Sequence, residues 1–228
     1  MPIRAQLIQD IENVLGPIVQ SNLLPSQHGW DLYEGYIWSL VVEAGRRLGA
    51  NISYEDILGN QTTSLTFRTN PGTIFPQRNT PVPTRYTHAI ISFLSKPPLE
   101  VHQGIYVTGK SGLVHECDVV VVSRAEAAAC RASGSAHPRC AKSLLAVECK
   151  YLSSNPGIKL AREFLGLTVD LWNENRFFVC NRSQDETKRF LTHHKRKWSY
   201  ETLPSNQTVV NELRSLFQRA FREYTASN

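Results

Sequence analysis

The sequence predicts an α/β protein in which a mixed central β-sheet is flanked by helices. Helical periodicity comes first, short apolar segments typical of buried strands occupy the middle, and helical and extended segments alternate after residue 150. The 228 residues, 41% hydrophobic and 20% charged, have the length and composition of one globular domain. We therefore expect residues 1–228 to form a single domain.

The amino-terminal part of the chain is predicted to be helical. Apolar residues recur at helical spacing over residues 3–23, where Pro17 is expected to kink or end the helix. A second helix is predicted over residues 31–48, just before Gly49. Asp31 is expected to be its N-cap, with Glu34 three residues later as in a capping box.

Extended segments follow. Residues 59–98 hold six of the twelve prolines and are predicted to form an edge hairpin with a long loop. Apolar runs typical of strands buried on both faces predict central strands at 101–108, 114–122 and 143–151. The intervening residues 124–142, rich in Ala, Ser and Gly, are interpreted as a hairpin connection enlarged by an insertion.

The last third of the chain alternates again. The pattern predicts a helix, a short strand and two further helices at residues 159–173, 177–180, 185–194 and 206–224. This third also holds the charge. The net charge is +5, residues 1–141 are neutral overall, and residues 142–228 carry the whole excess. Such a basic region favours a polyanionic partner such as nucleic acid, and an ordinary solvated helix surface is the alternative.

Several classes of protein are excluded or disfavoured. No apolar run approaches the ~18 residues that a membrane-spanning helix needs. The first residues are charged where a signal peptide would be apolar, so we expect a cytoplasmic, intracellular protein. Five cysteines without a Cys-x-x-Cys pair indicate reduced thiols. A zinc site of Cys130, His137 and Cys140 would lack a fourth ligand.

Polar residues that interrupt apolar strands form the candidate site. Glu148 and Lys150 are two residues apart on one predicted strand, so they share a face and Cys149 points the other way. If the strand with Asp118 is its neighbour, a second carboxylate joins them. One lysine does not neutralise two carboxylates, whereas Mg²⁺ takes carboxylate ligands together with phosphate and water. The alternative is a structural Glu148–Lys150 ion pair.

Glu34 is an independent acidic candidate. It lies near the start of the second predicted helix, at the edge of the apolar face, so its carboxylate is expected to lean inward. Glu43 in the same helix is expected to face solvent. The alternative for Glu34 is a capping-box residue stabilised by the helix dipole.

In this order the residues resemble the PD-(D/E)XK nuclease superfamily, which has the restriction-endonuclease-like fold. The resemblance spans residues 30–182 and leaves residues 183–228 as a basic helical extension. One departure is Cys117, which stands where the name-giving pattern has proline. A second departure is the long separation of Asp118 from Glu148. The matching residues and segments are Glu34, Gly112-Leu-Val-His-Glu-Cys-Asp118-Val-Val-Val, Ala146-Val-Glu148-Cys-Lys150, and a helix with Lys159, Arg162 and Glu163.

The resemblance implies a metal-dependent endonuclease that hydrolyses phosphodiester bonds in line. Asp118 and Glu148 would hold Mg²⁺, with Mn²⁺ as a substitute, helped by the Cys149 carbonyl. Glu34 would hold a second metal or its water shell. Lys150 would position the attacking water and stabilise charge on the phosphate.

The partner implied is nucleic acid, with DNA favoured over RNA. Five basic residues are expected to contact phosphates, namely Lys159, Arg162, Lys195, Arg196 and Lys197. The resemblance is compatible with a defence, mobile-element or repair system and with a homodimer or a partner protein. The competing hypothesis is a catalytically inactive nucleic-acid-binding or assembly subunit of the same fold.

Overall fold

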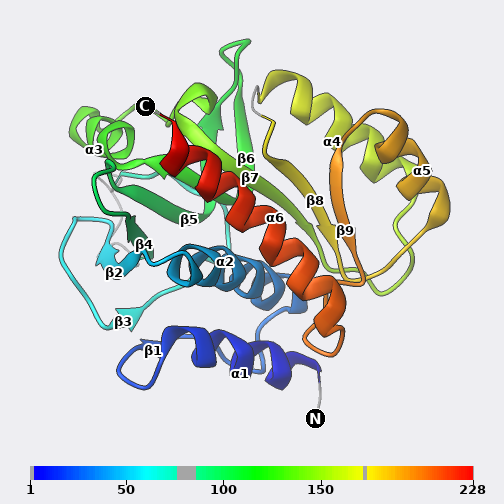
Figure 1. The fold of residues 1–228 in the computed structure, drawn as a ribbon, viewed down its shortest axis with the longest axis horizontal. Helices are drawn as coiled ribbons and strands as arrows, with labels where there is room; N and C mark the ends of the chain where they lie inside the picture. Colours follow the sequence, from blue (N-terminus) through cyan, green and yellow to red (C-terminus); the bar gives the residue numbers. More distant parts are fainter. Residues whose placement is uncertain (1–2, 76–85, 172–173, 228) are drawn as a thin grey trace.

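Seven strands form one sheet in the order β2-β4-β5-β6-β7-β8-β9 (Figure 1). The computed structural model describes residues 3–75, 86–171 and 174–227. Strands β1 (Gln20–Ser21) and β3 (Ser64–Leu65) make a separate two-stranded sheet. The strands of the large sheet are β2 (Asn51–Asp56), β4 (Thr87–Ser92), β5 (Leu99–Thr108), β6 (Val114–Ser123), β7 (Ser143–Lys150), β8 (Arg176–Cys180) and β9 (Lys197–Tyr200).

The sheet is mixed, as the sequence predicts. Neighbouring strands from β2 to β7 run antiparallel, whereas β7, β8 and β9 run parallel. A short 3-10 turn, Cys140–Lys142, precedes β7. The helices are α1 (Ile3–Leu15), α2 (Gly29–Arg47), α3 (Arg124–Ser133), α4 (Ile158–Asp170), α5 (Asp185–His193) and α6 (Gln207–Ala226).

Helices cover both faces of the sheet (Figure 1). On β8, Phe177 packs edge-on against Phe217 of α6, whereas the next residue, Phe178, packs against Phe164 of α4. The alternation of a strand therefore separates the α2–α6 layer from the α4–α5 layer. Among the described helices, none is both long and apolar enough to cross a membrane.

The carboxy-terminal residues 183–227 belong to this packing. They supply β9 to the sheet and α6 to the main hydrophobic core, where Val210, Leu213 and Phe221 are buried. The strand β9 is a correction, because its charged start at Lys197 suggested surface rather than a strand. Pairing with β8 and burial of Tyr200 outweigh that local signal.

The segment between β6 and β7 contains helix α3, whereas the sequence predicted only a hairpin connection enlarged by an insertion. The side chain of Ser123 caps α3 by accepting from the main-chain N–H of Glu126 over 3.3 Å. Gly134 ends the helix in the left-handed conformation at φ +65°. Both signals are present in the sequence, but the small residues of the segment obscured them.

The expected edge hairpin over residues 59–98 is wrong for the part that the structure describes. Strand β4 lies inside the sheet, between β2 and β5, and β2 was not predicted. Residues 64–65 pair with β1 in the small sheet. Residues 76–85, which the predicted loop includes, lie outside the described residues.

The ends of the first two helices also differ from expectation. Helix α1 ends at Leu15, before Pro17. Helix α2 begins at Gly29 with His28 as N-cap, so Asp31 sits in the first turn and does not cap. Glu43 is half-buried rather than solvent-facing, because it forms an ion pair with Arg214 of α6 over 2.9 Å.

Candidate functional site

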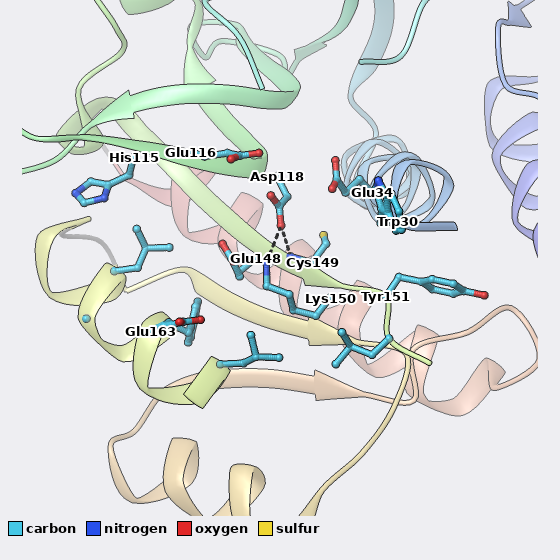
Figure 2. Close-up of a pocket in the computed structure, with 15 residues that line it drawn as sticks. Trp30, Glu34, His115, Glu116, Asp118, Glu148, Cys149, Lys150, Tyr151 and Glu163 are labelled. Atoms are coloured by element: carbon cyan, nitrogen blue, oxygen red, sulfur yellow. Dashed lines mark hydrogen bonds and ion pairs between the residues drawn. The ribbon is translucent and has the colours of Figure 1, made fainter. Parts of the chain in front are cut away.

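The predicted carboxylates meet where strands β6 and β7 stop pairing. The last pair of residues in register is Val119 and Val147, and Asp118 and Glu148 are the next residue on each strand. The main-chain N–H of Cys149 donates to Asp118 Oδ2 over 2.6 Å, so the side chain of Asp118 continues the connection between the strands (Figure 2). The two strands are therefore antiparallel neighbours, which is the condition that the sequence analysis set for Asp118 to join Glu148 and Lys150.

Lys150 lies between the two carboxylates, as Figure 2 shows. Its Nζ is 2.5 Å from Glu148 Oε1 and 4.0 Å from Asp118 Oδ2. Burial alone would lower the pKa of Lys150, but the charges of Glu148 and Asp118 outweigh it and raise that pKa. The lysine therefore carries a positive charge that faces both carboxylates.

Glu34 reaches the same site from helix α2. Gln103 of β5 donates to Glu34 Oε2 over 3.3 Å and to the carbonyl of Arg68 over 3.2 Å, which links the helix to the sheet. Burial raises the pKa of Glu34 to about 7, and the charges of Asp31 and Glu116 add to that effect. Glu34 thus points into the site as predicted, and it is not part of a capping box.

Glu116 is a fourth carboxylate, which the sequence analysis missed. It lies two residues before Asp118 on β6 and lines the same pocket. Burial raises its pKa, and the charge of Glu148 raises it further. The i, i+2 spacing that linked Glu148 to Lys150 applies equally to Glu116 and Asp118 and would have identified it.

The site has a strong excess of acidic over basic side chains. Burial raises the pKa of Asp118 well above its usual range, and the charges of Glu148 and Glu34 raise it further, against the opposing effect of Lys150. Among the residues that line the pocket, Lys150 is the only lysine or arginine. A buried carboxylate with half-buried ones beside it, around one ammonium, is stabilised either by bound protons or by a hard cation.

These side chains line a cavity of about 660 Å³, a volume within the ~300–1,000 Å³ of ligand sites. Helix α4 supplies a largely apolar wall with Leu160, Phe164 and Leu167, and Glu163 at its edge. His115 lines the opposite end, where its Nε2 is 2.5 Å from Asp170 Oδ2. Strict strand alternation would turn His115 to the face opposite Asp118, yet it lines the same pocket and contacts α4.

No protein-family model, curated protein or solved structure matches this chain. The resemblance to the PD-(D/E)XK superfamily therefore depends on the order of elements and on the residues of this pocket.

The basic residues predicted to bind nucleic acid do not line the pocket. Lys159 is exposed on α4, 3.8 Å from Glu163, and α4 turns other residues toward the cavity. Arg162 is exposed as well. Neither residue lines the pocket, and Lys159 reaches only Glu163 at its edge.

The predicted basic cluster at residues 195–197 is also separate from the pocket. Lys197 lies in register with Phe177, at the opposite end of the parallel strands from Lys150, which is in register with Cys180. Lys197 is half-buried, and its Nζ donates to Asn175 Oδ1 over 2.6 Å. Lys195 is exposed and Arg196 is half-buried. The described residues therefore do not form a continuous basic surface around the acidic site.

A second group of ionisable residues lies under helix α3. His88, Glu100 and His102 are the only three His, Cys, Asp or Glu residues in the described part of the chain whose potential ligand atoms all lie within 4.8 Å. Among the described residues, no three pocket carboxylates have potential ligand atoms that close together. The same holds for Cys130, His137 and Cys140. Arg131 donates to both oxygens of Glu100, over 2.6 and 2.8 Å, so this group is a buried ion-pair network. All five cysteines are free and buried.

Proposed function

We propose that the protein is a divalent-metal-dependent endonuclease of the PD-(D/E)XK type, which hydrolyses phosphodiester bonds of nucleic acid and prefers DNA to RNA. The observation that carries the proposal is the convergence of Asp118, Glu148 and Lys150 at the end of the β6–β7 ladder, with Glu34 facing them from helix α2. Free buried thiols support an intracellular place of action.

The donor set suits Mg²⁺ or Mn²⁺. Both ions prefer carboxylate and carbonyl oxygens, and Mg²⁺ sites typically use one or two carboxylates plus substrate phosphate. Burial and like charges oppose the ionised form of Asp118 and so raise its pKa. The same burial and charges favour a bound cation at this donor set. Asp118, Glu148, Glu34 and the carbonyl of Cys149 would hold the ion. When bound, it supplies positive charge for the phosphate and lowers the pKa of water.

The chain's own residues then have distinct roles. Lys150 orients the phosphate and the attacking water with its ammonium group and stabilises the charge that develops on the phosphate oxygens. Glu148, 2.5 Å from Lys150, fixes the position of that ammonium. Without the cation, the remaining carboxylates repel a phosphodiester, so binding at the pocket depends on the metal.

The decisive experiment is a cleavage assay with purified protein on single-stranded and double-stranded DNA and on RNA. We expect cleavage with Mg²⁺ or Mn²⁺ and none with EDTA. Asp118→Asn and Lys150→Met are expected to remove it. Asp185→Asn on α5, with a side chain 90% exposed, and Lys142→Met at an exposed position are matched controls expected to retain it.

The inactive-subunit hypothesis makes the opposite forecast. Binding of nucleic acid with no cleavage under any metal would favour it. Cleavage that survives Lys150→Met would contradict the role given to Lys150. Unchanged Mn²⁺ affinity in Asp118→Asn, measured by calorimetry, would favour a purely structural Glu148–Lys150 ion pair.

A further inference from the structure

An exposed tryptophan stands at the rim of the acidic pocket. Trp30, in the first turn of α2, is 52% exposed and lines the cavity together with Glu34 (Figure 2). Among the Phe, Trp and Tyr residues of the described ranges, it is the only exposed one. Exposure of an indole keeps a large apolar area in water, and this one lies beside the candidate site, where a ligand could cover it.

The indole is held in place by its neighbours. The ring of His28 stacks on Trp30 with centroids 4.2 Å apart and planes at 9°. On the other side of the helix start, Tyr151 packs against Gly29, where a Cβ would lie 2.8 Å from its Cδ1 carbon. Tyr151 directly follows Lys150, so this contact places the start of α2, and Trp30 with it, beside the end of β7. The stacked imidazole covers one face of the indole and leaves the other for a ligand.

The chemistry around Trp30 selects the ligand. The carboxylates and Lys150 make the floor of the cavity polar, whereas the indole and Leu160 make part of its rim apolar. A nucleotide has the same division, with a charged phosphate and a flat apolar base. Stacking of a base on an aromatic side chain contributes ~1–3 kcal/mol and is insensitive to base identity.

We propose that Trp30 is a stacking platform for an unpaired nucleobase next to the scissile phosphate, so that the pocket acts on single-stranded segments. The inference rests on the proposed function, which places the phosphate on Lys150. Bases inside a duplex already stack on their neighbours, and extruding one costs a few kcal/mol. Single strands, frayed ends and flaps offer such a base without that cost.

The test measures binding of labelled oligonucleotides by fluorescence anisotropy in the presence of Ca²⁺. It uses protein in which Asp118 is intact, and it does not require cleavage. Three probes of equal length are compared: a single strand, its blunt duplex, and a single strand with abasic positions, which keeps the phosphates and removes bases. We expect Trp30→Ala to weaken binding of the single strand ~5- to 150-fold, the equivalent of ~1–3 kcal/mol. Its effect on the other two probes is expected to stay within ~2-fold.

Two further variants keep the result specific. Trp30→Phe retains an aromatic face and is expected to recover most of the affinity. Leu58→Ala removes a side chain of similar exposure, 54%, away from the pocket and is expected to change nothing. Quenching of tryptophan fluorescence by the single strand should be lost in Trp30→Phe, because the quenched indole is then absent.

The outcomes separate the two proposals. Equal losses on all three probes, or no loss on any of them, would overturn the stacking role while metal-dependent cleavage could still stand. Trp30-dependent binding of single strands without cleavage would support the platform and overturn the nuclease. A protein that binds none of the probes, and instead retains a protein partner through Trp30, would overturn both.

Discussion

Asp118 Oδ2 accepts a hydrogen bond of 2.6 Å from the main-chain N–H of Cys149, at the first position where strands β6 and β7 no longer pair. The bond holds a buried carboxylate in the gap between two strands. Its charge faces Glu148 and Glu34, and burial together with these charges raises the pKa of Asp118. The same side chain therefore joins the strands and is the carboxylate that a bound proton or, under the proposed function, a cation would stabilise.

Two substitutions of Asp118 separate these functions. Asp118→Asn keeps an oxygen that accepts from Cys149, so we expect a folded protein that Mg²⁺ no longer stabilises. The wild type should gain ~2.7 kcal/mol in unfolding free energy at a Mg²⁺ concentration of 100 times the dissociation constant. Asp118→Ala should cost a further ~1–3 kcal/mol, because the Cys149 N–H loses its partner. Urea unfolding with and without Mg²⁺ measures both, and equal Mg²⁺ stabilisation of all three proteins would contradict the assignment.

The raised pKa of Glu34 predicts a pH-dependent stability. Its carboxyl group binds a proton more tightly in the folded than in the unfolded protein, so stability falls as the pH rises from ~4.5 towards 7. When EDTA keeps metal away, the Glu34→Gln protein should not lose this stability as the pH rises, because glutamine binds no proton. We expect it to match the wild type near pH 4.5 and to exceed it at pH 8 by up to ~3 kcal/mol, at 1.36 kcal/mol for each pKa unit. Urea unfolding at the two pH values decides, and a constant difference between them would refute the burial effect.

The contact between Gly29 and Tyr151 predicts a steric coupling. Alanine favours a helix by ~1 kcal/mol over glycine, but here its Cβ would collide with the Tyr151 ring. We expect Gly29→Ala to destabilise the protein by ~1–3 kcal/mol, as overpacking does. Tyr151→Ala removes the obstacle, so the alanine at position 29 should be neutral or stabilising in that background. A double-mutant cycle by urea unfolding measures the coupling, and additive effects would argue against the clash.

The network around Glu100 predicts acid sensitivity on the other half of the sheet. Burial would raise the pKa of Glu100, but hydrogen bonds from Arg131 and His102 hold it well below its usual range. A depressed folded pKa gives stability that is present above the unfolded value, ~4.3, and is lost as the pH falls further. Glu100→Gln leaves Arg131 unpaired and should cost ~3–5 kcal/mol at pH 7. Its unfolding free energy should also depend less on pH below 4.5, and an unchanged acid dependence would count against the network.

The positions of Lys195 and Arg196 predict that they affect the salt dependence of nucleic-acid binding and not the rate of cleavage. They lie away from the pocket, so Lys195→Gln with Arg196→Gln should leave the maximal cleavage rate unchanged. If both contact phosphates of a single strand, the slope of log affinity against log salt should become shallower by ~1.4. Lys197 is left intact because it donates to Asn175. Binding isotherms at several salt concentrations test this, and an unchanged slope would remove these residues from the interface.

Local sequence signals were sufficient for part of the site. The spacing of Glu148 and Lys150 puts them on one face of any strand. The apolar residues beside Asp118 predict that its strand is buried in the sheet. The same spacing rule would have included Glu116. Helix α3 was missed although Ser123 and Gly134 mark its ends, because a segment rich in Ala, Ser and Gly was interpreted as a loop.

By itself, the sequence determined a mixed α/β protein and the shared strand face of Glu148 and Lys150, and the pairing of β6 with β7 added Asp118 to them. The first two features depend on alternation and helical periodicity, which act over a few residues. Only the tertiary structure decided that Glu34 and Trp30 reach the same pocket and that Lys195 does not. Strand order and the packing of α2 result from the burial of apolar faces that are far apart in the chain, and no local pattern specifies which distant residues that burial brings together.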